Sequence, residues 1–165
     1  MSQRLSFVRH HYDGTRRGNV TDAQGVTMRI RVIGYWATTI IIVLELVAGG
    51  ATDLARGPAL LVAGPSVVSA LAQLGYPTYL LTILGLWKLL GAIALLVPGF
   101  QRLKEWAYAG IIFEMTGAAA SWSACGDKGS NLIVPLILAL LAVASWALRP
   151  PSRTLGALFR AGQRT

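Results

Sequence analysis

The sequence is poor in charged residues, which excludes an ordinary soluble domain. Only 13% of its 165 residues are charged, while 54% are hydrophobic. A soluble globular domain carries about 25% charged residues. The mean hydropathy of +0.55 points the same way. The composition therefore predicts an integral membrane protein, with the lipid bilayer as its main surroundings.

Cysteine and histidine are also scarce, which excludes disulfide and metal frameworks. Because Cys125 is the one cysteine, no disulfide can form within the chain. His10 and His11 are adjacent in a polar segment and lack the spacing of a metal site. No haem, flavin or iron–sulfur ligand pattern is present. We expect no bound metal or haem, and any electrons would have to come from a partner's cofactor.

The net charge of +8 does not indicate a nucleic-acid partner, because the basic residues gather at the two ends. Six of fifteen Lys and Arg residues lie in the first 31 positions, and four lie in the last 17. The apolar middle shows neither an aromatic-basic stripe nor a zinc-finger pattern. The charge distribution is therefore a topology signal, and no nucleic-acid partner is expected.

Four apolar runs predict an all-α, integral membrane four-helix bundle. They cover residues 33–51, 77–97, 105–124 and 132–148, each close to the roughly 20 residues that cross a bilayer. Runs of this length form helices, since lipid leaves no partner for unpaired backbone groups. Between the first two, Pro58 and Pro65 interrupt an apolar stretch, which predicts a short interfacial helix or a re-entrant segment. The domain plan is thus a basic tail (1–32), a transmembrane domain (33–148) and a basic tail (149–165).

The charges around the predicted spans orient the bundle. With four spans, both termini share one side with the loop at 99–104, and that side collects twelve Lys and Arg residues. The opposite side has two, Arg56 and Lys128. Basic loops stay in the cytoplasm, so the prediction is a multi-pass protein of a cell membrane, a bacterial inner membrane, with cytoplasmic termini.

Three charged residues lie deep inside the predicted spans, away from the span ends: Glu45, Lys88 and Glu114. All three lie at nearly one depth near the bilayer centre, where a charge costs roughly 2.5–3.5 kcal/mol. Pairing across the bundle offsets much of this cost, so we expect Lys88 to meet Glu114, Glu45 or both. With two carboxyl groups against one cation, a neutral cluster has one carboxyl group protonated.

Two interpretations of this cluster stay open. In the first, it only specifies which helices meet. In the second, it is a ligand-binding site or a proton relay, to which Trp87 also contributes because it lies mid-span beside Lys88. Gly110, Glu114 and Gly117 share one helix face of small residues, which we expect to look inward against another helix.

The stretches "LGYP", "LGLWKLLGAIALLVPG", "LKEWAYAG" and "TGAAAS" between residues 74 and 121 carry a resemblance. Their order and spacing resemble the DoxX-like family of small four-helix membrane proteins. The lysine at Lys88 and the glutamate at Glu105 match that family's pattern, and a carboxylate at Glu114 fits it. The family includes a membrane subunit linked to thiosulfate:quinone oxidoreduction, members associated with redox enzymes, and relatives resembling assembly chaperones. The resemblance supplies no set of catalytic residues.

The leading functional hypothesis is an accessory or anchor subunit of a membrane redox system. A site formed by Lys88, Glu114, Glu45 and Trp87 would bind quinone, with a soluble or membrane oxidoreductase as partner. Such a subunit is not catalytic alone. The alternatives are a small-solute or proton carrier or channel, formed as a homo-oligomer, and an assembly factor that binds a partner's helix. Cys125 is expected to be a bystander.

Overall fold

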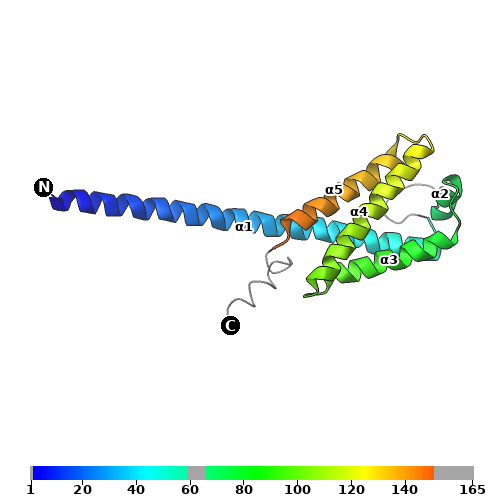
Figure 1. Cartoon of the computed structure of the whole chain (residues 1–165), viewed down its shortest axis with the longest axis horizontal. Helices are drawn as coiled ribbons and strands as arrows, with labels where there is room; N and C mark the ends of the chain where they lie inside the picture. Colours follow the sequence, from blue (N-terminus) through cyan, green and yellow to red (C-terminus); the bar gives the residue numbers. More distant parts are fainter. Residues whose placement is uncertain (1, 59–65, 151–165) are drawn as a thin grey trace.

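The structure is all-helical over the residues that it describes (Figure 1). The computed structural model describes the backbone of residues 2–58 and 66–150, and side chains from residue 25 onward. This part of the chain contains five helices and no strand: α1 (Ser2–Ala55), α2 (Val67–Gln73), α3 (Tyr79–Leu96), α4 (Gln101–Ala124) and α5 (Ser130–Leu148). The predicted all-α class is confirmed.

Three of the described helices are long and apolar enough to cross a membrane. They are the segment Gly25–Ala55 of α1, together with α3 and α5. Helix α4, predicted as the third span, has 24 residues but is less apolar, because Glu114 and several glycine, serine and threonine residues interrupt its apolar ones. Composition therefore supports a membrane protein with three candidate spans.

Helix α1 is the element whose extent differs most from the prediction. It begins at Ser2 rather than at residue 33, so the predicted tail is continuous with the first span. The physical reason is that the chain has no proline before Pro58 to break a helix. Between α1 and α3, the predicted short helix is present as α2. Residues 59–65 of the predicted re-entrant stretch and 151–165 of the C-terminal tail lie outside the described residues.

The four long helices pack pairwise around a shared core. Helix α1 contacts α3 and α5, and α4 contacts α5 and α3 (Figure 1). The buried core side chains come from all four: Ile42, Leu46, Ala92, Leu95, Tyr108, Ile111, Met115, Ala139 and Ala142. Three hydroxyl groups meet beside this core, since Ser145 Oγ on α5 lies 2.7 Å from Thr39 Oγ1 and 2.8 Å from Tyr108 Oη.

Large apolar side chains also cover much of the outer surface. They include Trp87, Ile93, Trp106, Phe113 and Leu140, each more than half exposed. Contiguous exposed apolar surface on this scale is unfavourable in water and marks a surface that meets lipid or another protein. The outside of the helices is therefore suited to a bilayer.

Two turns end their helices with glycine in the left-handed region. Gly75 (φ 77°) follows α2 and Gly126 (φ 82°) follows α4, a conformation that costs glycine least. In the turn after Gly126, Asp127 Oδ1 accepts a 2.6 Å hydrogen bond from the Gly129 N–H. Its Oδ2 accepts a 2.8 Å bond from Asn131 Nδ2. These two hydrogen bonds hold the pKa of the Asp127 carboxyl group below its ordinary value. The bond from the Gly129 N–H has the larger effect and the bond from the Asn131 amide the smaller.

Candidate functional site

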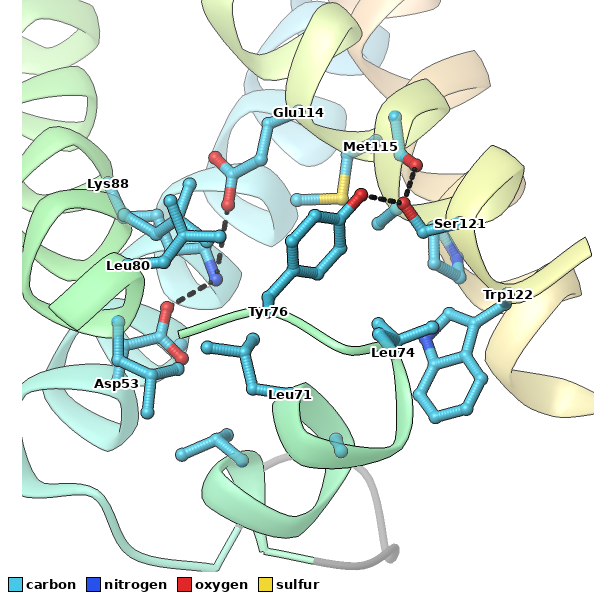
Figure 2. A pocket seen from close by; sticks show the side chains of 18 of the residues that line it. Asp53, Leu71, Leu74, Tyr76, Leu80, Lys88, Glu114, Met115, Ser121 and Trp122 are labelled. Atoms are coloured by element: carbon cyan, nitrogen blue, oxygen red, sulfur yellow. Dashed lines mark hydrogen bonds and ion pairs between the residues drawn. The ribbon is translucent and has the colours of Figure 1, made fainter. Parts of the chain in front are cut away.

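Lys88 projects from α3 toward two carboxylates on neighbouring helices (Figure 2). Its Nζ donates a 2.8 Å hydrogen bond to Asp53 Oδ2 near the end of α1. The same Nζ lies 3.3 Å from Glu114 Oε1 on α4. The expected pairing of Lys88 with Glu114 is therefore present. These three side chains, which we name the Lys88 cluster, join α1, α3 and α4 at one point.

Glu45 lies beside this cluster but makes no ion pair with Lys88 in the described part of the chain. Its neighbour on the helix surface is Gly49, one turn away. A Cβ atom added to Gly49 would lie 3.1 Å from Glu45 Oε1 and 3.4 Å from Lys88 Nζ. The absence of a side chain at Gly49 therefore lets the two charged groups approach the same point on α1.

Asp53 is the member of the site that the sequence analysis missed. It falls beyond the predicted end of the first span, where a carboxylate is expected to belong to a loop and to face solvent. Helix α1 continues to Ala55, however, and the Asp53 side chain is only 7% exposed. The available signal was the spacing of Glu45, Gly49 and Asp53, which repeats every four residues and marks one helix face.

The charges of the site do not balance. Three carboxyl groups, those of Glu45, Asp53 and Glu114, gather around the one ammonium group of Lys88. Lys88 is 12% exposed and Glu114 is 18% exposed, so water screens them poorly. Several adjacent unpaired negative charges are costly away from water. The arrangement favours protonation of a carboxyl group, or a bound group that supplies hydrogen-bond donors.

A cavity of about 540 Å³ opens next to the Lys88 cluster, and we name it the first cavity. Most of its wall is apolar, with leucines from α2 and α3 and Phe113, Met115 and Trp122 from α4. Glu45, Asp53, Lys88 and Glu114 also line it. Its size falls within the range of about 300–1,000 Å³ typical of small-molecule sites. It can therefore hold an apolar body with one polar end against Lys88.

The α2–α3 turn covers part of this cavity. Tyr76, in the turn, contacts Ser121 on α4 through their hydroxyl oxygens at 2.9 Å (Figure 2). Ser121 Oγ also donates to the Gly117 carbonyl oxygen. Leu71 and Leu74 from α2 and its end complete this side of the wall. The short helix predicted between the first two spans thus belongs to the site.

Trp87 faces away from the first cavity. Its side chain is 66% exposed, and it lines a second cavity of about 310 Å³ between α3 and α4. Lys88 and Glu114 line both cavities. The structure therefore brings Lys88, Glu114 and Glu45 together around the first cavity and places Trp87 beyond them.

The glycines of α4 do not make the close helix contacts expected of them. A Cβ atom added to Gly110 or Gly117 would meet nothing within 4 Å, because each glycine faces a cavity. Close packing occurs instead where α1 crosses α3. There, a Cβ atom on Gly85 would lie 2.9 Å from the Gly50 carbonyl oxygen. The expectation of an inward, tightly packed small face was therefore wrong for α4.

The turn between α3 and α4, at the end of this helix pair away from Tyr76, is held by polar contacts that the sequence analysis did not anticipate. The buried Lys104 Nζ donates to three carbonyl oxygens at the end of α3, those of Ala94, Leu95 and Val97. Glu105 accepts hydrogen bonds from Arg149 Nη2 and Trp146 Nε1, both at 2.7 Å. Lys104 and Arg149, counted only as topology charges, are thus structural residues.

No group of His, Cys, Asp or Glu suited to a metal ion occurs among the described residues. In comparisons with known proteins, the sequence profile of the DoxX-like family matches residues 37–145. That match covers more than half of the 165 residues and includes Glu45, Asp53, Lys88 and Glu114. No curated protein and no solved structure matches the chain.

Proposed function

The chain belongs to the DoxX-like family, and from this premise we propose that it is a membrane accessory subunit that binds quinone in the first cavity. The observation that carries the proposal is the position of Lys88, whose ammonium group lies at the wall of an apolar cavity of about 540 Å³. A quinone has the matching form, a flat apolar ring that carries carbonyl oxygens.

The chemistry of the Lys88 cluster suits a quinone ring. The Lys88 ammonium carries three N–H donors, and only the bonds to Asp53 and Glu114 engage it among the described residues. A quinone carbonyl oxygen accepts the remaining N–H, and a protonated carboxyl group from Glu45 or Glu114 donates to the same oxygen, since Glu114 Oε1 lies only 3.3 Å from Lys88 Nζ. Protonation of that carboxyl group reduces the excess of carboxylates over cations, and the quinone itself adds no charge.

The ring itself would lie among the apolar side chains of the first cavity. Leu71, Leu81 and Met115 are buried and line it. Trp122 is also buried there and offers an aromatic face for stacking. Because this chain is proposed to bind rather than to oxidise, electrons come from an oxidoreductase partner that carries its own cofactor.

The proposed membrane arrangement is a four-helix bundle in which α4 is the fourth span. Burial of α4 residues such as Tyr108, Met115 and Ala119 against its neighbours supports this arrangement. A helix that is sheltered by other helices tolerates a lower hydropathy than one surrounded by lipid. The excess of basic residues at the two termini and the α3–α4 turn supports a cytoplasmic location for these parts, in a bacterial inner membrane.

Fluorescence quenching tests quinone binding directly. The protein is placed in lipid nanodiscs that lack quinone and is titrated with a benzoquinone carrying a decyl chain. Because quinone rings quench nearby indoles, saturable quenching that is reduced in Trp122→Phe would support binding in the first cavity. The double variant Lys88→Met with Glu114→Gln should weaken binding by about tenfold or more, the loss of at least one charge-assisted hydrogen bond.

A matched control removes one positive charge elsewhere. Arg102 is exposed and lines neither cavity, so Arg102→Met should bind like the parent. Absence of saturable binding to the parent would refute the quinone proposal. Proton flux in liposomes would then favour a carrier, and a co-purifying membrane protein would favour an assembly factor.

A further inference from the structure

The two cavities follow one another along the α3–α4 interface. On α3, the first cavity is lined from Leu80 to Lys88 and the second from Leu84 to Ala94. On α4, the residues lining the second cavity run from Leu103 to Glu114, and those lining the first run from Phe113 to Trp122. Leu84, Lys88 and Glu114 line both, so the Lys88–Glu114 pair lies where the two cavities meet.

The second cavity differs from the first in its polarity. Apart from Lys88 and Glu114 at its inner end, it is lined by leucine, isoleucine, alanine, glycine and tryptophan residues. The first cavity has in addition Glu45, Thr52, Asp53, Tyr76 and Ser121. A polar solute would find no further hydrogen-bond partner in the second cavity except the two indole N–H groups. A hydrocarbon chain fits it better.

The second cavity also lies at the outer apolar surface of the protein. Trp87 and Trp106 line it and are 66% and 78% exposed. Gly91 and Gly110 face it from α3 and α4, and a Cβ atom on Gly110 would meet nothing within 4 Å. The two glycines thus leave space between α3 and α4. In the proposed arrangement, this space extends to the surface that lipid covers.

We propose that the second cavity holds the apolar tail of the quinone whose head occupies the first cavity. This inference rests on the proposed function and narrows its ligand to a long-tailed membrane quinone. The head lies against Lys88, and the tail passes the Lys88–Glu114 pair and leaves between α3 and α4. A tail-less, water-soluble quinone would use the first cavity alone.

Glycine substitutions separate the two cavities experimentally. Gly110→Leu fills the second cavity, and Gly117→Leu fills the first, because both glycines face open space. Two probes are titrated in the same nanodiscs: a dimethoxy-methyl-benzoquinone without a tail, and the same ring with a decyl chain. Comparing each variant with the parent for one probe at a time cancels the partitioning of that probe into lipid.

We expect Gly110→Leu to weaken binding of the decyl quinone by about tenfold, because overpacking an occupied site usually costs this much. Binding of the tail-less quinone should stay unchanged. Gly117→Leu should weaken the binding of both probes. Gly91→Leu approaches the second cavity from α3 and provides a second variant if Gly110→Leu unfolds. Thermal melting identifies the folded variants.

The outcomes keep this inference distinct from the proposed function. If the parent binds both probes and the folded Gly110→Leu and Gly91→Leu variants bind the decyl quinone as the parent does, the tail path is refuted while quinone binding stands. Equal weakening of the binding of both probes by these variants also overturns the proposed position of the tail, because the second cavity would then hold the quinone head. If the parent binds neither probe, the proposed function fails and the tail path fails with it.

Discussion

Gly50 on α1 and Gly85 on α3 bring two helix backbones into contact. A Cβ atom on Gly85 would lie 2.9 Å from the Gly50 carbonyl oxygen and 2.9 Å from Leu54 Cγ. Real Cβ atoms do not approach a backbone oxygen so closely. This crossing sets the distance between α1 and α3, and therefore the distance over which Lys88 reaches Asp53.

Gly85→Ala should therefore separate the two helices. We expect a destabilisation of about 1–3 kcal/mol, the usual cost of overpacking, measured by unfolding in detergent. Gly110→Ala is the matched control on α4, where an added Cβ atom meets nothing within 4 Å. It should be neutral or stabilising by about 0.5–1 kcal/mol, since alanine favours a helix. Equal effects of the two substitutions would contradict the close contact at Gly85.

Lys88→Met should destabilise the protein because Asp53 and Glu114 lose their shared cation. We expect a loss of about 3 kcal/mol, within the range for breaking a poorly exposed ion pair. Adding Glu114→Gln to Lys88→Met should recover part of the loss, and adding Asp53→Asn should recover more. A single variant that melts like its parent would show that the Lys88 cluster does not hold the three helices together.

The proposed topology predicts where Cys125 can be labelled. Cys125 is exposed at the end of α4, on the outer side if α4 spans the membrane. An impermeant maleimide should therefore label it in intact cells. In a Cys125→Ser background, a cysteine at Arg102 should be labelled only after permeabilisation. Labelling of both positions from the same side would exclude α4 as a span.

The turn after α4 predicts a pH dependence. The pKa of the Asp127 carboxyl group is lower in the folded chain than its ordinary 3.8 because Gly129 and Asn131 donate to the carboxylate. A group with a lowered folded pKa stabilises the fold above its unfolded pKa, and this contribution is lost as the pH falls through the folded pKa. Asp127→Asn should therefore melt below the parent at pH 7, and the difference in melting temperature should shrink as the pH falls below 3.8 and through the lowered pKa of the folded chain. A difference that persists in acid would contradict an electrostatic origin.

Helices α3 and α5 were largely predictable because each is a long apolar run between turn residues. The boundaries of α3 and α5 differ from the prediction by at most two residues. The start of α1 was not predictable in the same way. Hydropathy detects the part of a helix that suits lipid, whereas helix formation continues through the polar residues before it.

The site was predictable only in part, because the sequence reveals charges in the middle of an apolar run but not those near a helix end. Lys88 and Glu114 stood out because each is a lone charge in an apolar run. Asp53 did not, since it lies near a helix end, and only the α1–α3 crossing at Gly50 and Gly85 carries it to Lys88. The cavities leave no sequence pattern, because they arise where glycines of one helix face small or distant side chains of another.

The contacts of Lys104 have a mechanical consequence. One ammonium group holds three carbonyl oxygens where α3 turns into α4, so this end of the hairpin is a fixed corner. At the other end, the hydroxyl contact between Tyr76 and Ser121 connects the α2–α3 turn to α4. We therefore expect α3 and α4 to separate least at Lys104 and most near Tyr76, where separation must break the Tyr76–Ser121 contact as well as the Lys88–Glu114 pair.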